Sequence, residues 1–278
     1  MKVILSKHAG FCFGVKRAIK TAIEAKKAAN GRVYTYGPLI HNPQVVSKFE
    51  RDGIVAVESV SNIKSGSTII IRTHGVSPAI EEIFRKKKLK IIDATCPFVK
   101  KPQKNIAKLV AAGYKTVIIG EADHPEVQGI KGYSVEKAGI VGTPEEAKKL
   151  VPSGKLGIVV QTTQSMKNFQ QIMEILLKKA QEVKIYNTIC SATHERQDSA
   201  LKLAGEVDIM IVVGGHNSAN TKHLAEVCET TGVVTRQIED ASELQNAWFK
   251  GKKKAGVTAG ASTPEWVIKE VVSKLKKL

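Results

Sequence analysis

The sequence predicts an α/β fold built from three small units with mostly parallel sheets. Short strands rich in Val and Ile alternate with amphipathic helices along the chain, a pattern typical of parallel sheets joined by helices. One local arrangement also occurs three times. An apolar strand runs into a turn that holds Cys12, Cys96 or Cys190, and a helical run follows.

These periodicities predict the individual elements in order. The predicted strands are Val3–Leu5, Val33–Tyr36, Thr68–Arg72, Lys90–Asp93, Thr116–Gly120, Gly157–Gln161, Val183–Tyr186, Val207–Val213, Val233–Gln237 and Gly256–Thr258. The predicted helices are Val15–Ala29, Pro43–Asp52, Pro78–Lys87, Val99–Ala112, Ser165–Glu182, Glu195–Ala204, Ala219–Thr231 and Pro264–Leu278. Pro78 and Pro264 begin helices, where the first turn tolerates proline.

The cysteine spacing predicts three blocks of similar length. Cys96 lies 84 residues after Cys12, and Cys190 lies 94 residues after Cys96. The first block covers residues 13–96 and the second covers residues 97–190. The third, residues 191–278, has no closing cysteine strand of its own, so we expect residues 1–12 to complete it. This division predicts a pseudo-threefold (trefoil) arrangement of the units around a shared centre.

Composition narrows the classes of function. Basic residues outnumber acidic ones by 43 to 26, a formal net charge of +17. Scarce arginine and 5% aromatic residues favour a lysine-rich solvated surface over a nucleic-acid interface. A positive field also helps to capture a small anionic substrate.

The sequence also indicates a compartment. Its apolar stretches are too short to span a bilayer, and the N-terminus lacks a signal-peptide pattern. We therefore expect a cytoplasmic protein with no membrane or nucleic-acid partner. In a reducing compartment, cysteines serve as metal ligands, catalytic groups or core residues rather than as disulfides.

Polar loops follow most of the predicted strands. In open parallel sheets, ligands bind beyond the carboxyl ends of the strands. Most of these loops lead at once into a helix, whose free N–H groups and positive dipole end favour an anion. Several such ends together suit a diphosphate. The candidate phosphate donors are His41, His74, Ser218, Asn220 and Ser262, of which the last three also have the simpler interpretation of helix caps.

A second set of residues is suited to proton transfer. His124 and Glu126 flank Pro125, so one turn carries both an imidazole and a carboxylate. Together with the hydroxyl of Thr162 they form a candidate proton relay. The remaining histidines are expected to be structural or exposed; they are His8, His194, His216 and His223.

Three cysteines at equivalent strand ends predict a metal centre. Zinc prefers four tetrahedral ligands and usually a close Cys-x-x-Cys pair, which this sequence lacks. Soft thiolates also select iron–sulfur clusters, whose all-cysteine cubanes normally take four thiolates. Three thiolates would leave one iron open to a substrate oxygen. Cys228 lies inside a helical run and is expected to be a core residue.

A series of motifs resembles the 4-hydroxy-3-methylbut-2-enyl diphosphate reductase family, the last enzymes of the methylerythritol phosphate route to isoprenoids. The resemblance covers essentially the full length. The matching segments are Gly10–Val15, the His41–Asn42 turn, Thr73–Ser77, Asp93–Pro97, His124–Val127, Gln161–Thr163, the Cys190 turn with Arg196–Gln197, Asn217–Asn220 and Ala259–Ser262.

The resemblance implies a three-lobed fold around one [4Fe–4S] cluster, held by Cys12, Cys96 and Cys190 with one open iron. It implies that the diphosphate is bound by His41, His74, His124, Ser218, Asn220 and Ser262. Thr162 would contact the substrate hydroxyl, and Glu126, with Thr162 and His124, would deliver protons. Ala219 departs from the pattern, since the family commonly has a second serine there. One diphosphate hydrogen bond then passes to a backbone N–H or is lost.

The implied reaction is reduction of the allylic diphosphate to isopentenyl and dimethylallyl diphosphate. A small ferredoxin or flavodoxin would donate the electrons, in agreement with the absence of a Gly-x-Gly-x-x-Gly dinucleotide fingerprint. Two other interpretations stay open. One is a non-redox cluster hydro-lyase, which needs no electron donor, and the other is a metal-stabilised nucleic-acid-binding protein.

Overall fold

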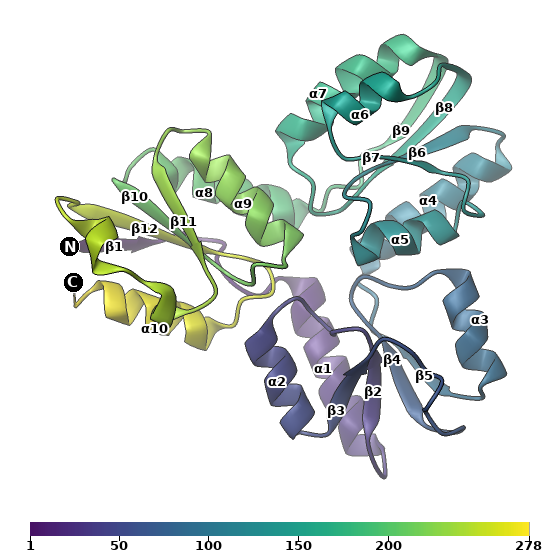
Figure 1. Cartoon of the computed structure of the whole chain (residues 1–278), viewed down its shortest axis with the longest axis horizontal. Helices are drawn as coiled ribbons and strands as arrows, with labels where there is room; N and C mark the ends of the chain where they lie inside the picture. The colour runs from purple at the N-terminus through teal and green to yellow at the C-terminus, as the bar shows by residue number, and fades with distance from the viewer. Residues whose placement is uncertain (278) are drawn as a thin grey trace. The chain divides into compact units, whose positions relative to one another are not determined.

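The computed structural model of the chain describes residues 1–277. It contains three four-stranded sheets, all of them parallel, joined and covered by helices (Figure 1). The predicted α/β class with parallel sheets is therefore confirmed. By internal contacts the chain divides into two compact units. One comprises Met1–Val15, Ile40–Val45 and the segment from Ser191 onward. The other comprises Lys16–Leu39 and Val46–Cys190.

The first sheet has the strand order β3-β2-β4-β5. Its strands are β2 (Val33–Tyr36), β3 (Ile54–Val57), β4 (Thr68–Ile71) and β5 (Lys90–Asp93). The helices of this stretch are α1 (Phe13–Ala28), α2 (Pro43–Arg51) and α3 (Pro78–Lys86). Phe84 of α3 is fully buried against Ile69 and Ile71 of β4. These two residues share one face of the strand because side chains alternate along it.

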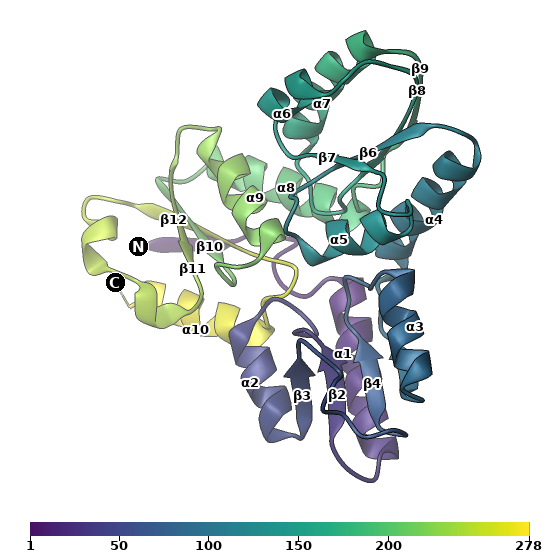
Figure 2. The ribbon, with the colours of Figure 1, turned by 45° about the vertical axis from the view of Figure 1, so that its right-hand side comes forward.

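The second sheet has the order β7-β6-β8-β9. Its strands are β6 (Lys115–Ile119), β7 (Gly139–Val141), β8 (Ser153–Val160) and β9 (Ala180–Tyr186). The helices are α4 (Pro97–Ala111), α5 (Pro125–Gly132), α6 (Pro144–Lys149), α7 (Met166–Leu176) and the 3₁₀ turn η1 (Leu177–Lys179). Ile118 and Val159 pack with residues of α4 and α5, whereas Val117 and Ile158 pack with residues of α6 and α7. Helices therefore cover both faces of this sheet (Figures 1 and 2).

The third sheet has the order β1-β12-β10-β11. Its strands are β1 (Lys2–Leu5), β10 (Ile209–Val213), β11 (Val234–Ile238) and β12 (Lys254–Ala259). The helices are α8 (Ser191–Ala204), α9 (Ala219–Glu229), α10 (Glu265–Leu275) and the 3₁₀ turns η2 (Ala241–Glu243) and η3 (Asn246–Phe249). In β10, Ile209 and Ile211 meet α10, whereas Met210 and Val212 meet α8 and α9. Burial on both faces explains why the sequence of β10 is a continuous apolar run.

The three sheets share one topology. If the strands of each sheet are counted along the chain, with β1 counted last in the third sheet, each has the order second-first-third-fourth. β1 pairs in parallel with β12, so it occupies the place that β5 and β9 take in the other sheets. The division into three blocks requires this pairing of β1 with β12. The residue boundaries of the three blocks stay a prediction.

Some elements differ from those expected. The short strands β3 and β7 and the helices α5 and α6 were not predicted, because each offers too few residues for a clear periodicity. The helix predicted over Ser165–Glu182 is wrong at its end. It stops at Leu176, and the chain is already in β9 from Ala180. β9 is an edge strand with mostly exposed polar side chains, so its sequence resembles the end of a surface helix.

Two further expectations concern the chain's ends and membranes. The last residue of the predicted C-terminal helix, Leu278, lies outside the described residues, and α10 ends at Leu275. Among residues 1–277, no helix combines the length and the apolar character needed to cross a bilayer.

Phe84 provides a test of the first sheet's core. Phe84→Ala should lower the free energy of unfolding by about 3–5 kcal/mol, because it leaves a cavity against β4. The neighbouring Ile83 is 48% exposed, so Ile83→Ala is a matched control expected to stay within about 0.5 kcal/mol of the wild type. Denaturant unfolding followed by circular dichroism measures both. Equal losses in the two variants would contradict the described packing.

Candidate functional site

Every predicted substrate-binding residue follows one of the two central strands of a sheet. The pairs of central strands are β2 and β4, β6 and β8, and β10 and β12. His41 and His74 follow the first pair, His124 and Thr162 follow the second, and Ser218, Asn220 and Ser262 follow the third. The chain leaves these two strands in opposite directions across the sheet, which is the switch point where α/β sheets bind ligands.

The three cysteines follow the fourth strand of each sheet. Cys12, Cys96 and Cys190 come after β1, β5 and β9, and each immediately precedes a helix, namely α1, α4 or α8. Each also makes the same backbone hydrogen bond to the loop that follows the third strand. The N–H of Cys12 donates to Ala261 O (3.1 Å), that of Cys96 to Thr73 O (3.0 Å) and that of Cys190 to Thr162 O (3.0 Å). Each cysteine is thus fastened to a loop with candidate substrate-binding residues.

The cysteine side chains differ in environment. Cys12, Cys96 and Cys190 are partly exposed, none of the three is in a disulfide, and each lies at a helix N-terminus. The positive end of a helix dipole favours negative charge on such a group. Cys228 is fully buried in α9, and burial raises its pKa to about 12. The expectation that Cys228 is a core residue is confirmed.

Glu126 and Thr162 form a buried pair. Glu126 is only 1% exposed. The backbone N–H of Thr162 donates to Glu126 Oε1 and its hydroxyl donates to Oε2, both at 2.7 Å. Burial raises the pKa of Glu126 to about 7, although the two hydrogen bonds from Thr162 act in the opposite direction. A carboxyl group that titrates near neutral pH is suited to general acid catalysis.

His124 extends this pair toward His74. The Nδ1 atom of His124 accepts a hydrogen bond from the backbone N–H of Glu126 (3.1 Å), so the neutral ring carries its proton on Nε2. The His74 and His124 rings stand edge to face, with centroids 5.4 Å apart. Gly132 of α5 packs closely against Ser77, three residues after His74, because a Cβ on Gly132 would lie 2.2 Å from Ser77 Cβ. His74, His124, Glu126 and Thr162 therefore lie in one connected group.

A second group lies in the other compact unit. The hydroxyl of Ser262 donates to the carbonyl of His41 (3.0 Å). A Cβ on Gly215 would lie 3.0 Å from the same carbonyl, so the loop that leads to Ser218 and Asn220 also passes close to His41. Ser218 caps α9. The Nδ2 atom of Asn220 is buried and has no hydrogen-bond partner among the described residues. An unpaired buried donor is costly and indicates a polar ligand at this position.

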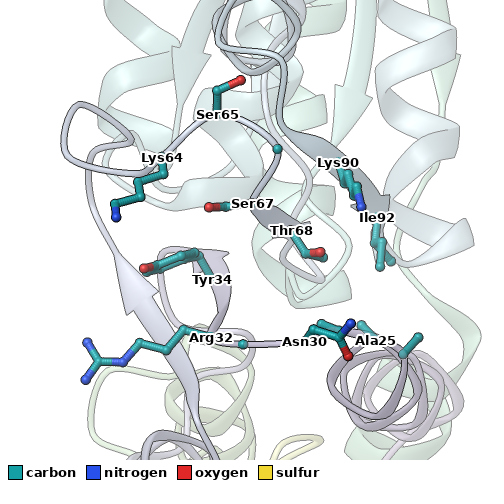
Figure 3. Close-up of a pocket in the computed structure, with 14 residues that line it drawn as sticks. Ala25, Asn30, Arg32, Tyr34, Lys64, Ser65, Ser67, Thr68, Lys90 and Ile92 are labelled. Atoms are coloured by element: carbon teal, nitrogen blue, oxygen red, sulfur yellow. The ribbon is translucent and has the colours of Figure 1, made fainter.

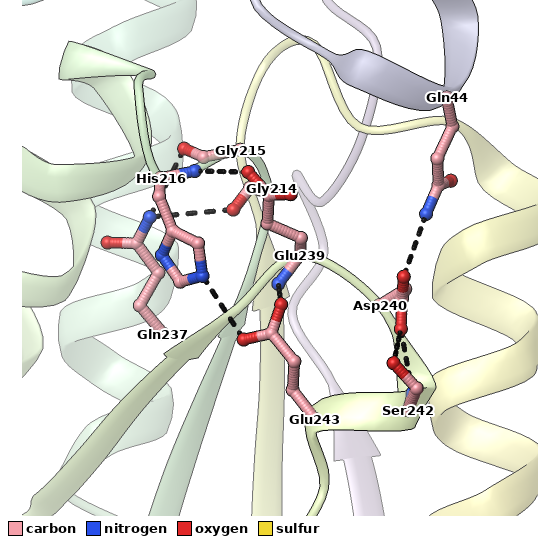
Figure 4. Close-up of polar contacts among 9 residues, drawn as sticks. All are labelled: Gln44, Gly214, Gly215, His216, Gln237, Glu239, Asp240, Ser242 and Glu243. Carbon is pink, nitrogen blue, oxygen red and sulfur yellow. Dashed lines mark hydrogen bonds and ion pairs between the residues drawn. The ribbon is translucent and has the colours of Figure 1, made fainter. Parts of the chain in front are cut away.

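Three side chains from β11 and the turn after it hold that loop in shape (Figure 4). Gln237 Nε2 donates to the carbonyl of Gly215 (3.2 Å), and Glu239 Oε1 accepts from the N–H of His216 (2.8 Å). Glu243 Oε2 lies 3.1 Å from His216 Nε2. No feature of the sequence pointed to these positioning residues, since β11 and the turn after it carry none of the motifs.

Two further positioning residues are Asp93 and Arg17. Asp93 Oδ1 accepts from the N–H of Thr95 (2.9 Å), and Arg17 Nη1 donates to Thr95 O (3.0 Å), so both hold the turn before Cys96. Burial opposes the charge of Asp93, but hydrogen bonds from Lys100 and Thr95 keep its pKa below the ordinary value. The sequence pointed to Asp93 through its place in the Asp93–Pro97 segment, whereas no feature of the sequence pointed to a positioning role for Arg17.

The remaining histidines have the structural or surface positions expected for them. His8, His194 and His216 each lie within 4 Å of a carboxylate on partly exposed or exposed surface, at Glu195, Asp198 and Glu243. His223 is buried in α9.

A hollow of about 590 Å³ lies at the opposite end of the first sheet (Figure 3). Thr68 at the start of β4, Lys90 at the start of β5 and Asn30 after α1 line it. None of the candidate site residues lines it, so it is separate from the switch-point loops.

The chain matches known proteins over its full length. The LytB protein family matches residues 3–276. The 4-hydroxy-3-methylbut-2-enyl diphosphate reductase of Geotalea uraniireducens is 53% identical, with 100% of this chain and 98% of that protein covered. The same enzyme of Geobacter sulfurreducens is 49% identical, with 100% of this chain and 98% of that protein covered.

Solved structures give the same result. A structure of (E)-4-hydroxy-3-methyl-but-2-enyl diphosphate reductase, described as the terminal enzyme of the non-mevalonate pathway, is 46% identical and covers 100% of both chains, with a TM-score of 0.72. The E-1-hydroxy-2-methyl-but-2-enyl-4-diphosphate reductase of Plasmodium falciparum is 33% identical and covers 99% of this chain and 88% of that one, with a TM-score of 0.96. The chain therefore belongs to the LytB protein family.

Proposed function

We propose that the chain catalyses the reductive dehydroxylation of 4-hydroxy-3-methylbut-2-enyl diphosphate to isopentenyl and dimethylallyl diphosphate. The named relatives support this reaction. The observation that carries it in this chain is the buried pair of Glu126 and Thr162 beside His124. Loss of a hydroxyl as water requires a proton donor at the leaving oxygen, and this pair supplies one.

The diphosphate end of the substrate is assigned to the switch-point loops. His124 would donate through Nε2, since its Nδ1 already accepts from Glu126 N. Asn220 would donate through Nδ2, which has no partner among the described residues. Ser218 accepts from Thr221 N, so its hydroxyl proton is free for a phosphate oxygen. Ser262 donates to His41 O and would have to rotate to reach a phosphate. His41 and His74 complete the proposed set.

Proton delivery is assigned to Glu126 acting through Thr162. With Glu126 ionised, the Thr162 hydroxyl donates to it. With Glu126 protonated, the carboxyl donates to Thr162 Oγ1, and the threonine proton then points outward to the substrate. Thr162 can then give its proton to the leaving hydroxyl while it takes the proton of Glu126, which leaves Glu126 ionised and Thr162 neutral, as in the first of these two arrangements. The raised pKa keeps the acid form populated up to about pH 7.

A [4Fe–4S] cluster fits the thiol donor set. Cys12, Cys96 and Cys190 are outside disulfides, partly exposed and placed before helix N-termini that favour negative charge. We propose that these three residues hold the cluster and that no fourth protein ligand completes it. The bound cluster would pass on two electrons from an external reductant, one at a time, and would act as a Lewis acid toward the hydroxyl group.

The reaction takes up two electrons and two protons, so it needs an external reductant. We assign this role to a ferredoxin- or flavodoxin-type protein, and a cytoplasmic location goes with this assignment. Turnover without any reductant would instead identify the non-redox hydro-lyase.

Replacing Glu126 tests the acid. Glu126→Gln keeps an acceptor for Thr162 N but has no proton to give, so kcat should fall by about 100-fold or more, with the iron–sulfur absorbance unchanged. The wild-type kcat should be constant at acidic pH and should fall as pH rises through about 7, where Glu126 ionises. Dithionite-driven rates measure both effects. A near wild-type rate in Glu126→Gln would rule out this role.

The relay through Thr162 has its own matched pair of variants. Thr162→Val keeps the shape but removes the hydroxyl and should lower kcat by about 100-fold. Thr162→Ser restores the hydroxyl and should recover most of the rate. If valine and serine reduce the rate equally, the hydroxyl carries no proton and Thr162 acts only through packing.

The cysteine assignment predicts a clear difference among four serine variants. Cys12→Ser, Cys96→Ser and Cys190→Ser should each lose most of the iron and sulfide found after anaerobic purification. Cys228→Ser should keep them, because Cys228 is a core residue of α9. Chemical analysis of iron and sulfide gives the result without an activity assay. Iron retained in any of the first three variants at the wild-type level would remove that residue from the ligand set.

A further inference from the structure

We propose that one face of α4 is the docking surface for the electron donor, a small acidic redox protein. This α4 face consists of Phe98, Lys101, Lys104 and Lys108. The inference rests on the proposed function, because a reductase whose chain carries no dinucleotide fingerprint must receive electrons at its surface.

The charge of α4 is entirely of one sign. Its 15 residues include Lys100, Lys101, Lys104 and Lys108 and no aspartate or glutamate. Lys101, Lys104 and Lys108 recur at helical spacings of three and four residues, so they share one face. All three are exposed, and none pairs with a carboxylate of residues 1–277. Like charges at i and i+4 disfavour a helix, so an acidic partner relieves a repulsion present in the free protein.

Lys100 plays a different part. It pairs with Asp93, which also accepts from the N–H of Thr95. Lys100 and Asp93 thus hold the turn before Cys96, and Arg17 holds its other side through Thr95 O. Because these contacts use separate side chains, the α4 face can bind a partner without disturbing the cysteine turn.

The α4 face also lies close to a proposed ligand of the cluster. Cys96 is the N-cap residue of α4. At a rise of about 1.5 Å per residue, Lys101 lies about 7 Å along the helix axis from Cys96 and Lys104 about 12 Å. A donor bound here places its redox group near Cys96, which shortens the path of the electron.

An apolar centre completes this surface. Phe98 is half-buried and lies next to the exposed Pro97. Lys101 Nζ lies 4.9 Å from the centroid of the Phe98 ring, close enough for a cation–π contact. A small apolar centre with a charged rim is the usual build of an interface, and transient redox complexes bury areas at the low end of the range.

Another basic surface fits the donor less well. The hollow at the amino ends of β4 and β5 has Arg32 and Lys64 on one side and Lys90 on the other, with no carboxylate among its lining residues (Figure 3). It lies at the opposite end of β5 from Cys96, so an electron entering there would have to cross the length of the sheet.

Charge reversal tests the α4 face. The variant Lys101→Glu/Lys104→Glu/Lys108→Glu should lose about 10-fold or more in kcat/KM with a reduced plant-type ferredoxin as donor at low salt. Its rate with dithionite and methyl viologen should stay within twofold of the wild type, since small reductants need no docking surface. High salt should reduce the difference between wild type and variant with ferredoxin, because it screens the charges.

A matched control changes the net charge equally elsewhere. Lys149→Glu/Lys178→Glu/Lys276→Glu alters three exposed lysines of α6, η1 and the end of α10 and should keep the ferredoxin-driven rate within about threefold of the wild type. Calorimetric binding of oxidised ferredoxin to the anaerobic holoprotein should weaken only in the α4 variant. Equal losses in both triple variants, or a parallel loss with dithionite in the α4 variant, would overturn the proposal.

The same experiment separates this inference from the proposed function. If the wild type reduces the substrate with dithionite but the α4 variant matches it with ferredoxin, the function stands and the docking surface is wrong. If the wild type reduces the substrate with neither reductant, the proposed reaction is wrong, and the docking surface falls with it.

Discussion

The site depends on a constraint that parallel sheets impose. The carboxyl ends of all strands in such a sheet meet at one edge, and each strand must then return through a crossover. In this chain the crossover helices therefore start at that edge, with free N–H groups. Polar loops follow the two central strands, and a cysteine follows the fourth. The N–H of each cysteine binds a loop after the third strand, at Ala261, Thr73 or Thr162. One backbone pattern, used three times, joins the proposed ligands of the cluster to the proposed ligands of the substrate.

The chemistry within that frame depends on a balance at Glu126. Complete burial favours the neutral acid, and two hydrogen bonds from Thr162 favour the carboxylate. Burial has the larger effect, so the pKa of Glu126 is raised, and the hydrogen bonds limit the rise to about 7. The carboxyl group can therefore both hold and release a proton near neutral pH. A carboxyl group without the Thr162 contacts would stay protonated to higher pH. An exposed carboxyl group would be ionised at all pH values near neutrality. Thr162 therefore tunes the acid as well as extending it toward the substrate.

The sequence allowed the α/β class and most of the strands to be predicted, because Val- and Ile-rich runs are local signals. The strand-end loops were a second local signal, and they supplied the candidate site residues. The sequence also led us to expect that residues 1–12 complete the third block, and β1 does pair with β12. It did not reveal the strand order that the three sheets share, because that order depends on pairing between distant segments. Nor did it reveal the buried environment that raises the pKa of Glu126, or the positioning roles of Arg17 and Glu239. Edge strands were hard to recognise, since β9 has mostly exposed side chains that resemble those of a surface helix. The cysteine ligand set and the substrate contacts stay predictions.

We propose that three thiolates, each following the fourth strand of a sheet, hold a cluster with one iron left for the substrate. Mössbauer spectroscopy of anaerobically prepared, isotope-enriched protein tests it most directly. We expect a [4Fe–4S] signal in which one of the four irons is distinct and changes when the substrate is added. A protein without iron, or a cluster with four equivalent irons that ignore the substrate, would contradict it.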